Sequence, residues 1–275
     1  MMKSRVAVIL PVYNKDRVPY FILSLESLLN QTYSDLFIYV GVDGPVNDEL
    51  SRVLKSYEQK EKVKIIWFSE NRGLAYVLND LLDICFFEGF NFIARMDADD
   101  ISLPERICKQ VAYLESHPDI DVVGGAITEI NYKGKLRGKE IFYPEGPSEC
   151  FEFFSRRNPH AHPAVMFRKS FFDKVTNKYR SSYRQNQDTM LWFDGFKAGT
   201  KNANLQEVIL KFRITNSFFK KRRNGYKFAL KQLKDRLEIN NELGYGFFAR
   251  IFAYMMFLML ISPAWVKKIA YKVFR

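Results

Sequence analysis

The chain has 275 residues, of which 47% are hydrophobic and 27% are charged. This length and composition exclude a disordered or collagen-like chain and suit one large domain, or one and a half. The three cysteines, Cys85, Cys108 and Cys150, are odd in number and far apart, which argues against a disulfide framework or a zinc site and favours reduced thiols.

The net charge of +11 is concentrated in the last quarter of the chain. Residues 201–275 hold 16 Lys or Arg but only 4 Asp or Glu. A nucleic-acid binder or a tail at a membrane surface would show this distribution, and we expect the second. The first apolar run, Val6 to Leu10, is too short for the core of a signal peptide, so we expect a cytoplasmic protein.

Short apolar runs alternate with segments of helical periodicity over the first 126 residues. The runs of strand length are 5–10, 37–42, 63–68, 92–96 and 121–126. The helical segments are 19–30, 48–57, 74–86 and 104–116. This alternation predicts an α/β fold with a mostly parallel sheet that is covered by helices on both faces.

Beyond residue 127 the alternation loosens. The pattern predicts a hairpin at 133–144, a short helix at 147–159, a strand entering a helix at 164–172, a helix ending at Gly199 and a strand at 207–214. A charged amphipathic helix is expected at 225–243. The most apolar part of the chain follows at 247–275.

The segment "ARMDADDISLPER", residues 94–106, crowds three carboxylates behind an apolar run. Ligands of parallel sheets bind beyond the carboxyl ends of the strands. Asp97 and Asp99 therefore suit a Mg²⁺ or Mn²⁺ ion, which takes few carboxylates and completes its shell with waters and phosphate oxygens. The alternative is a solvated acidic turn in which Asp100 helps to start a helix. Ser102 and Glu105 have the spacing of a helix capping box.

Two further strand ends carry candidate ligand contacts. Asp43 in "VDGP" either belongs to a turn or accepts a hydrogen bond from a nucleotide base or ribose. Arg72, next to Gly73, either just precedes a helix or faces an anion there. The first strand leads into "PVYN" without the glycines of a dinucleotide site, which argues against NAD-type binding.

The second half of the chain adds a candidate base and two histidines. Asp188 lies in the first turn of a predicted helix, where it either interacts with the helix dipole or acts as a general base. His160 and His162 lack a third ligand for zinc, so roles in a turn or in hydrogen bonding a substrate are favoured.

Together these stretches resemble the family 2 glycosyltransferases, in particular those of bacterial capsule, exopolysaccharide and O-antigen synthesis. The segments that carry the resemblance, over roughly residues 5–215, are "VILPVYNK", "GVDGP", "ENRGLAYVLN", "ARMDADDISLPERICKQVAYLESHPDIDVVGG", "RNPHAHPAVMFRKS" and "QDTMLWF". The resemblance implies the GT-A fold, with a nucleotide-sugar-binding half (1–126) and an acceptor-binding half (127–215). The basic tail, 216–275, would lie outside this domain.

The resemblance also implies roles for individual residues. Asp43 would contact the nucleotide base. Residues around the same pocket would be Pro11, Tyr13 and Arg72. Asp97 and Asp99 would form the DxD motif that meets the ribose, the Mn²⁺ or Mg²⁺ ion and the diphosphate, and Asp188 would be the catalytic base.

Two positions depart from the family pattern. Gln187 precedes Asp188 where the family has Glu, so the expected base lacks its usual acidic neighbour. Arg213 is not followed by the histidine that is frequent in the family. His160, His162 and Arg213 are kept as candidates for the acceptor or pocket.

The resemblance implies an inverting transfer from a nucleoside diphosphate sugar, with UDP as the expected nucleotide, to a glycan or a polyprenyl-diphosphate-linked acceptor. The alternatives are a sugar-phosphate nucleotidyltransferase and a non-catalytic nucleotide-binding protein tethered to a membrane. The first would need a glycine-rich loop that "PVYNKDR" lacks.

The last segment, 247–275, is interrupted by Arg250 and Pro263 and is too short to span a bilayer cleanly. Its aromatic and basic residues predict peripheral contact with the anionic inner face of the cytoplasmic membrane. A buried helix pair or a homo-oligomer interface is the alternative. We expect no nucleic-acid partner.

Overall fold

The structure is a computed structural model that describes residues 4–214 and 226–263. The strands are β1 (Val6–Val12), β2 (Leu36–Val42), β3 (Val63–Trp67), β4 (Phe92–Arg95), β5 (Ile101–Ser102), β6 (Val122–Ile130), β7 (Leu136–Ile141), β8 (Met166–Arg168) and β9 (Asn202–Arg213). The helices are α1 (Val18–Leu29), α2 (Asp48–Tyr57), α3 (Leu74–Phe87), α4 (Arg106–Ser116), α5 (Pro147–Phe154), the 3₁₀ turn η1 (His162–Ala164), α6 (Lys169–Lys174), α7 (Gln187–Lys197), α9 (Tyr226–Glu242) and α10 (Phe247–Ile261).

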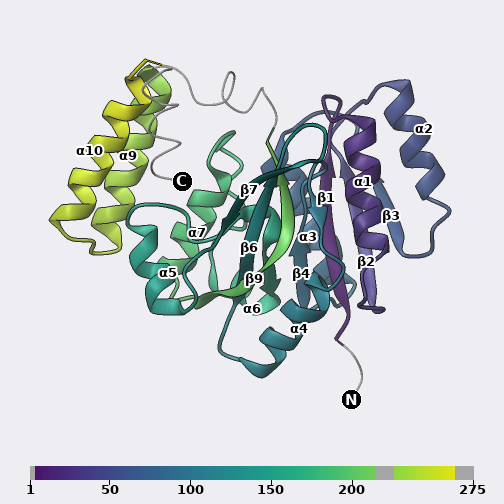
Figure 1. Cartoon of the computed structure of the whole chain (residues 1–275), viewed down its shortest axis with the longest axis horizontal. Coiled ribbons are helices and arrows are strands. Elements are labelled where there is room, and N and C mark those ends of the chain that lie inside the picture. The colour runs from purple at the N-terminus through teal and green to yellow at the C-terminus, as the bar shows by residue number, and fades with distance from the viewer. Residues whose placement is uncertain (1–3, 215–225, 264–275) are drawn as a thin grey trace.

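All the strands join one sheet in the order β3-β2-β1-β4-β8-β6-β9-β5, with β7 paired to β6 (Figure 1). β3, β2, β1 and β4 are mutually parallel, as are β6 and β9. The short strand β8 is antiparallel to both β4 and β6 and joins the two parallel groups. The predicted strand at 121–126 is therefore part of a second group and does not continue the first.

Helices cover both faces of the sheet, as the alternation predicts. Side chains alternate along each strand, so β1 places Val8 and Leu10 on one face and Ala7 and Ile9 on the other. The first face packs against α1, α2 and α4, and the second packs against α3, α5, α6 and α7. The side chains at the centre of both faces of the sheet are fully buried. This packing holds the strands, and therefore the strand ends that carry the candidate site, in place.

The predicted capping box before α4 is wrong. Ser102 lies in β5 and pairs with Leu210 of the antiparallel strand β9. Its backbone N–H donates a hydrogen bond to Ser27 Oγ at 3.0 Å. Glu105 makes no capping bond and instead lies 3.0 Å from Lys109 Nζ. Pairing with the long strand β9 is a tertiary contact that local sequence does not reveal, and it outweighs the capping signal.

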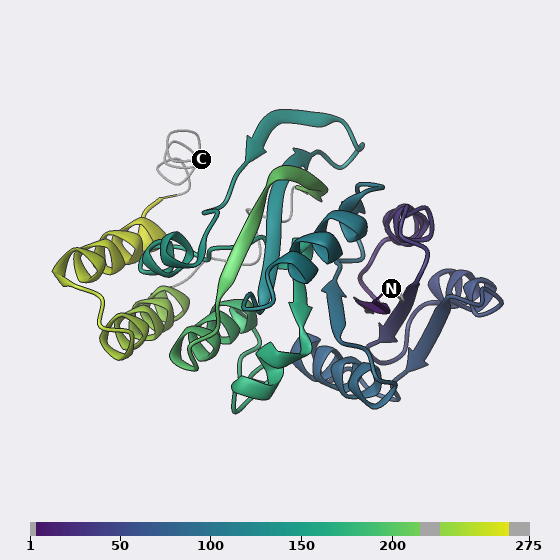
Figure 2. The ribbon, with the colours of Figure 1, turned by 90° about the horizontal axis from the view of Figure 1, so that it is seen from below.

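The predicted short helices and second-half strands are confirmed. The hairpin predicted within 133–144 is wrong in its bounds, because that segment holds only β7 and the partner strand β6 precedes it. β6 and β7 form the hairpin, and the helix predicted to end at Gly199 is α7, which is followed by Gly199 at φ +73°. α9 and α10 lie side by side at the end of the molecule opposite α2 (Figure 2). α9 contributes Ile239 to the second core. The part of the tail at 264–275, and residues 215–225, lie outside the described residues.

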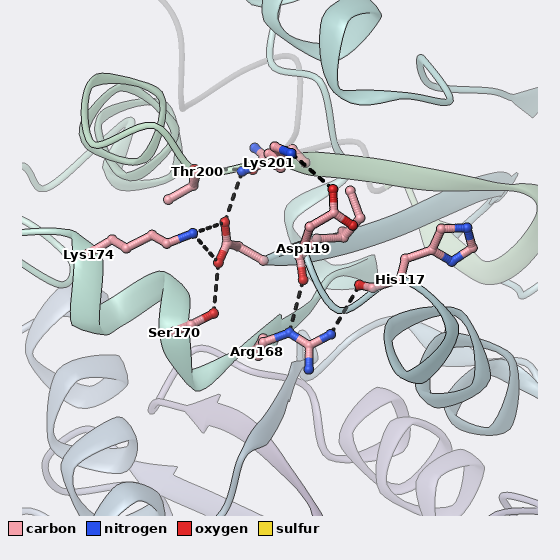
Figure 3. Close-up of polar contacts among 10 residues, drawn as sticks. His117, Asp119, Arg168, Ser170, Lys174, Thr200 and Lys201 are labelled. Atoms are coloured by element: carbon pink, nitrogen blue, oxygen red, sulfur yellow. Dashed lines mark hydrogen bonds and ion pairs between the residues drawn. The ribbon is translucent and has the colours of Figure 1, made fainter.

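A polar network ties the amino-terminal edge of the sheet together (Figure 3). The buried carboxylate of Asp121, just before β6, accepts bonds from Ser170 Oγ at 2.7 Å, Lys174 Nζ at 2.7 Å and the Lys201 backbone N–H at 3.0 Å. Arg168 donates to the Leu114 carbonyl at 2.5 Å, near the end of α4. These bonds link β8, β6, β9, α4 and α6 at the edge opposite the candidate site.

Candidate functional site

The carboxyl ends of β1, β2 and β4 meet at one edge because the three strands are adjacent and parallel. Val12 pairs with Val42, and the Asp43 N–H donates to the Val12 carbonyl at 2.7 Å. Met96, which follows β4, donates to the carbonyl of Ile9 at 3.1 Å. Chain positions far apart in the sequence, from Pro11 and Tyr13 to Asp43 and the carboxylates after β4, therefore come to the same edge of the sheet.

The carboxylate of Asp43 is buried and holds the loop that leads into α3. It accepts the backbone N–H groups of Arg72 at 2.9 Å and Gly73 at 3.0 Å. Gly73 has φ +99°, a conformation that favours glycine, and a Cβ on Gly44 would lie 2.4 Å from the Asn71 nitrogen. Asp43 therefore builds the loop, and its contact with a nucleotide base stays a prediction.

The Arg72 side chain points along α3 in this structure. Its guanidinium forms an ion pair with Asp80 and lies 5.1 Å from the ring centre of Phe68 and 5.5 Å from that of Tyr76. The aromatic rings and the carboxylate hold it beside the Asp43 loop. The predicted contact of Arg72 with a phosphate stays a prediction.

Three carboxylates gather behind β4. Ligand oxygens of Asp97, Asp99 and Asp100 lie within 4.8 Å of one another. Asp100 is fully buried and accepts the Arg213 backbone N–H at 2.8 Å. Burial raises the pKa of Asp100 well above its ordinary value, and the charges of Asp99 and Asp97 raise it further. Asp100 is thus part of the protein interior and not only a helper at a helix start.

Buried arginines compensate these negative charges. Arg95 Nη2 lies 2.5 Å from Asp97 Oδ1. Arg213 Nε donates to the Asp99 carbonyl at 2.7 Å, and its guanidinium lies 4.2 Å from the ring centre of Tyr20. Arg106 donates to the Arg95 carbonyl at 2.8 Å. The predicted candidate Arg213 therefore supports the acidic loop directly.

Sequence reasoning missed Arg95 and Arg106. Arg95 is the last residue of the apolar strand β4, and Arg106 lies on the buried side of α4 with Ile107 and Val111. A charged residue within an otherwise apolar strand or on the apolar side of a helix needs a buried partner. That signal was present in the sequence and pointed to the three carboxylates.

The donor set suits a hard divalent cation. The three carboxylates offer only oxygen ligands, and Asp100 Oδ2 is buried without a hydrogen-bond partner in the described part of the chain. Mg²⁺ and Mn²⁺ prefer such oxygen ligands. Asp97 and Asp99, both partly exposed, are the members that a cation and a substrate can reach.

Asp188 lies in the first turn of α7, as predicted. Asn158 Nδ2 donates to Asp188 Oδ2 at 2.9 Å, and Asn158 in turn accepts from Thr189 Oγ1 at 3.1 Å. Just before α7, Asn186 has φ +62°, an uncommon backbone conformation for a residue other than glycine. These contacts fix the orientation of the Asp188 carboxylate.

Tyr179 connects the acidic loop with Asp188. Burial raises the pKa of its hydroxyl, Arg95 lowers it, and the charges of Asp188 and Asp97 both raise it. The charges of both carboxylates therefore act on the hydroxyl of this one buried tyrosine. Its hydroxyl also lies 2.8 Å from His162 Nε2.

The two histidines are neutral parts of the wall behind the site. His160 is buried, with Nδ1 2.8 Å from Asn204 Oδ1 and its ring centre 4.9 Å from that of Trp192. The pKa of His162 is lowered well below its ordinary value by burial, by Arg95 and by His160. No cluster that includes a histidine suits a metal ion within the described residues. Contact of either histidine with an acceptor stays a prediction.

The buried His160 makes stability depend on pH. Burial lowers its pKa to about 4, whereas in the unfolded chain it titrates near the ordinary value of 6.5. The unfolded state therefore binds more protons as the pH falls, and stability is lost between pH 7 and 4. We expect His160→Gln to remove about 2 kcal/mol of the loss in unfolding free energy between pH 7 and 5. Urea unfolding of both proteins at the two pH values measures this, and equal losses would contradict the prediction.

The strand order and the acidic loop behind β4 define an α/β protein of the GT-A type. The chain belongs to glycosyl transferase family 2, whose family model matches residues 7–180. It is similar to the amylovoran biosynthesis glycosyltransferase AmsE of Erwinia amylovora, with 36% identity over 220 residues and 79% of each chain covered.

Two further comparisons extend this result. The chain is 26% identical over 228 residues to the UDP-Gal:alpha-D-GlcNAc-diphosphoundecaprenol beta-1,3-galactosyltransferase of Escherichia coli, covering 83% of this chain and 80% of that one. S. aureus TarS 1-349, crystallised in complex with UDP-GlcNAc, aligns with a TM-score of 0.66 at 16% identity, covering 93% of this chain and 72% of that one. The longer crystallised TarS chain is covered to 42%. The predicted fold and the predicted class, a glycosyltransferase, are confirmed.

Proposed function

We propose that the protein transfers a sugar from a nucleoside diphosphate sugar, with UDP as the expected nucleotide, to a hydroxyl group of a lipid-linked glycan during synthesis of a bacterial surface polysaccharide. The gathering of three carboxylates behind β4, with ligand oxygens within 4.8 Å of one another, is the observation that carries this proposal. The charges of both Asp97 and Asp188 act on the buried hydroxyl of Tyr179, which supports it. A leaving diphosphate at the acidic loop and an acceptor hydroxyl at Asp188 would then meet at the same reaction centre.

The residues of the site have separate tasks in this reaction. Asp99 and Asp97 would hold Mn²⁺ or Mg²⁺, which when bound supplies positive charge for the leaving diphosphate. Asp188, oriented by Asn158, removes the proton of the acceptor hydroxyl. The hydroxyl attacks the anomeric carbon on the face opposite the diphosphate, so the configuration inverts and no covalent enzyme intermediate is required.

The nucleotide would lie over the ends of β1 and β2. Asp43 fixes the loop at Arg72 and Gly73, and a further lone pair of its carboxylate can accept an N–H group of the base. Pro11 and Tyr13 would line the same pocket. The E. coli relative is named for a UDP-sugar donor and a diphosphoundecaprenol acceptor, which supports a uridine donor and a polyprenyl-diphosphate acceptor here.

An assay of nucleoside diphosphate release tests the reaction. The full chain is incubated with a panel of nucleotide sugars, Mn²⁺ or Mg²⁺, and lipid extract as the source of acceptor. We expect release from one donor to exceed that of Asp188→Asn. A sugar-phosphate nucleotidyltransferase would instead release pyrophosphate from a nucleoside triphosphate, and a non-catalytic protein would release neither product.

We further propose that α10 lies on an anionic membrane. Its outward face is apolar and exposed, and it consists of Phe247, Phe248, Ile251, Tyr254, Met255, Leu258 and Ile261. These positions recur every three or four residues, while Ala249 and Ala253 face inward. No described helix is long and apolar enough to cross a bilayer. The 15 residues of α10 reach about 22 Å, less than the roughly 30 Å of a hydrocarbon core.

The charge of the chain favours a lipid surface over a second copy of the protein. No acidic residue follows Glu242, whereas Arg250, Lys267, Lys268 and Lys272 are all basic, as is the final residue. Each such charge contributes about 1 kcal/mol at an anionic surface. Two copies that met through α10 would bring like charges together.

Flotation with vesicles tests this surface. We expect Phe248→Glu with Leu258→Glu to lower the fraction bound to phosphatidylglycerol vesicles by at least about tenfold, because two charges would enter the apolar layer. Phe87→Glu is the matched control, since Phe87 is 93% exposed on α3, away from α10. Unchanged binding of the double variant would refute the surface, and a protein that forms dimers and does not float would show that α10 covers a second copy.

A further inference from the structure

Three arginines are buried around the acidic loop. Arg95, Arg106 and Arg213 have exposed fractions of 2%, 0% and 3%. Guanidinium groups keep their proton at neutral pH, and even for Arg106, whose pKa burial and the charge of Arg95 lower to about 9, the protonated form predominates there. A buried positive charge is costly unless a negative charge or hydrogen bonds compensate it.

The arginines of this cluster carry at least as much positive charge as its carboxylates can carry negative charge. Arg95 pairs with the carboxylate of Asp97. The guanidinium groups of Arg106 and Arg213 donate to backbone carbonyls of Arg95 and Asp99. The carboxylates of the cluster are those of Asp97, Asp99 and Asp100. No ionisation state of the carboxylates gives the cluster a net negative charge. Sites that hold divalent cations tightly by themselves gain affinity from the number of negative ligands, and here the arginines cancel that gain.

The arginines also hold the loop in place. Arg95 binds the side chain of Asp97, and Arg213 binds the Asp99 carbonyl through Nε and Asp100 through its backbone N–H. Arg213 Nη1 further donates to the Asn131 carbonyl at 3.2 Å, at the turn of the β6–β7 hairpin. These contacts of Arg95 and Arg213 therefore help to define the shape of the acidic loop.

Some polar side-chain atoms of the arginines and of Asp100 make no hydrogen bond to the described residues. Arg95 Nε and Nη1, Arg213 Nη2 and Asp100 Oδ2 are buried and have no hydrogen-bond partner among the described residues. Each unpaired buried polar atom costs free energy, so the loop contains uncompensated atoms of both signs. A bound anion would compensate the charge of the arginine nitrogens, and a cation bound with it would compensate the charge of the carboxylates.

We infer that the three buried arginines prevent the acidic loop from retaining Mn²⁺ or Mg²⁺ alone, so that the cation binds together with the nucleoside diphosphate. The diphosphate brings the negative charge that the cluster lacks and oxygen ligands for the cation. Arg95 and Arg213 are thus positioning residues that make cation binding depend on the donor. This inference rests on the proposed function, in which Asp97 and Asp99 hold the cation.

Mn²⁺ binding to the full chain, followed through the electron paramagnetic resonance signal of free Mn²⁺, tests the inference. We expect UDP to tighten Mn²⁺ binding by at least about tenfold. We expect Arg95→Met to bind Mn²⁺ in the absence of UDP at least about tenfold more tightly than the parent protein, because one positive charge is lost. Arg95→Lys keeps the charge and is the matched control, with an affinity like that of the parent.

Equal Mn²⁺ affinity with and without UDP would overturn the inference and leave the proposed reaction intact. The same holds if Arg95→Met binds Mn²⁺ no better than Arg95→Lys. If the parent binds UDP but takes up no Mn²⁺ in its presence, the proposed metal site fails, and the inference fails with it. Circular dichroism checks the folding of each variant, and Arg213→Met compared with Arg213→Lys replaces the first pair if Arg95→Met does not fold.

Discussion

Asp188→Asn is expected to lower the rate of sugar transfer by about 10²- to 10⁴-fold, since an amide cannot take the proton of the acceptor hydroxyl. The amide has nearly the shape of the carboxylate, so α7 and the contact with Asn158 should persist. Donor binding should therefore change little. The measurement is kcat and KM for release of the nucleoside diphosphate in the presence of acceptor.

Asp173→Asn is the matched control for this variant. Asp173 lies on α6, is exposed and pairs only with Lys169 among the described residues. It should leave the rate unchanged. A rate for Asp188→Asn within a few-fold of the parent rate would remove Asp188 from the role of base.

Asp99→Asn is expected to lower the rate by about 10³-fold, because the leaving diphosphate would lose most of the positive charge that the cation supplies. Unlike the change at Asp188, this change should also weaken donor binding, since cation and diphosphate bind together. The measurement is the rate over a range of Mn²⁺ concentrations, together with titration of UDP.

Asp119→Asn serves as the control for the loss of an acidic group, because Asp119 is exposed at the opposite edge of the sheet and pairs with Lys201. The role of Asp99 would be disproved if its variant kept the Mn²⁺ dependence and the rate of the parent. A large loss of thermal stability in Asp99→Asn would instead show that the residue mainly supports the fold.

Local signals were sufficient for much of the fold. The helix predicted at 48–57 has the same bounds in the structure, because Asn47 caps it and its apolar residues recur with helical spacing. The acidic loop, Asp43 and Asp188 all lie where the strand and helix patterns place them. These features depend on periodicity and on turn chemistry, which a sequence displays directly.

Features that depend on contacts between distant segments could not be predicted in the same way. Ser102 joins β9 more than a hundred residues later, and β8 enters the sheet between β4 and β6. The pairing of Arg95 with Asp97 was open to prediction, but its burial depends on the helices that cover β4. The division of the chain into 1–215 and a separate tail stays a prediction.

The network around Asp121 has a mechanical consequence for the enzyme. It fastens the amino ends of β6 and β9 and the adjoining end of β8, while the loops that carry the carboxylates leave the sheet at the other edge. The hydrogen bonds of Asp121 thus hold one edge of the sheet together, away from the acidic loop. A rearrangement of the acidic loop around donor and acceptor would therefore leave the bonds of Asp121 at the opposite edge in place.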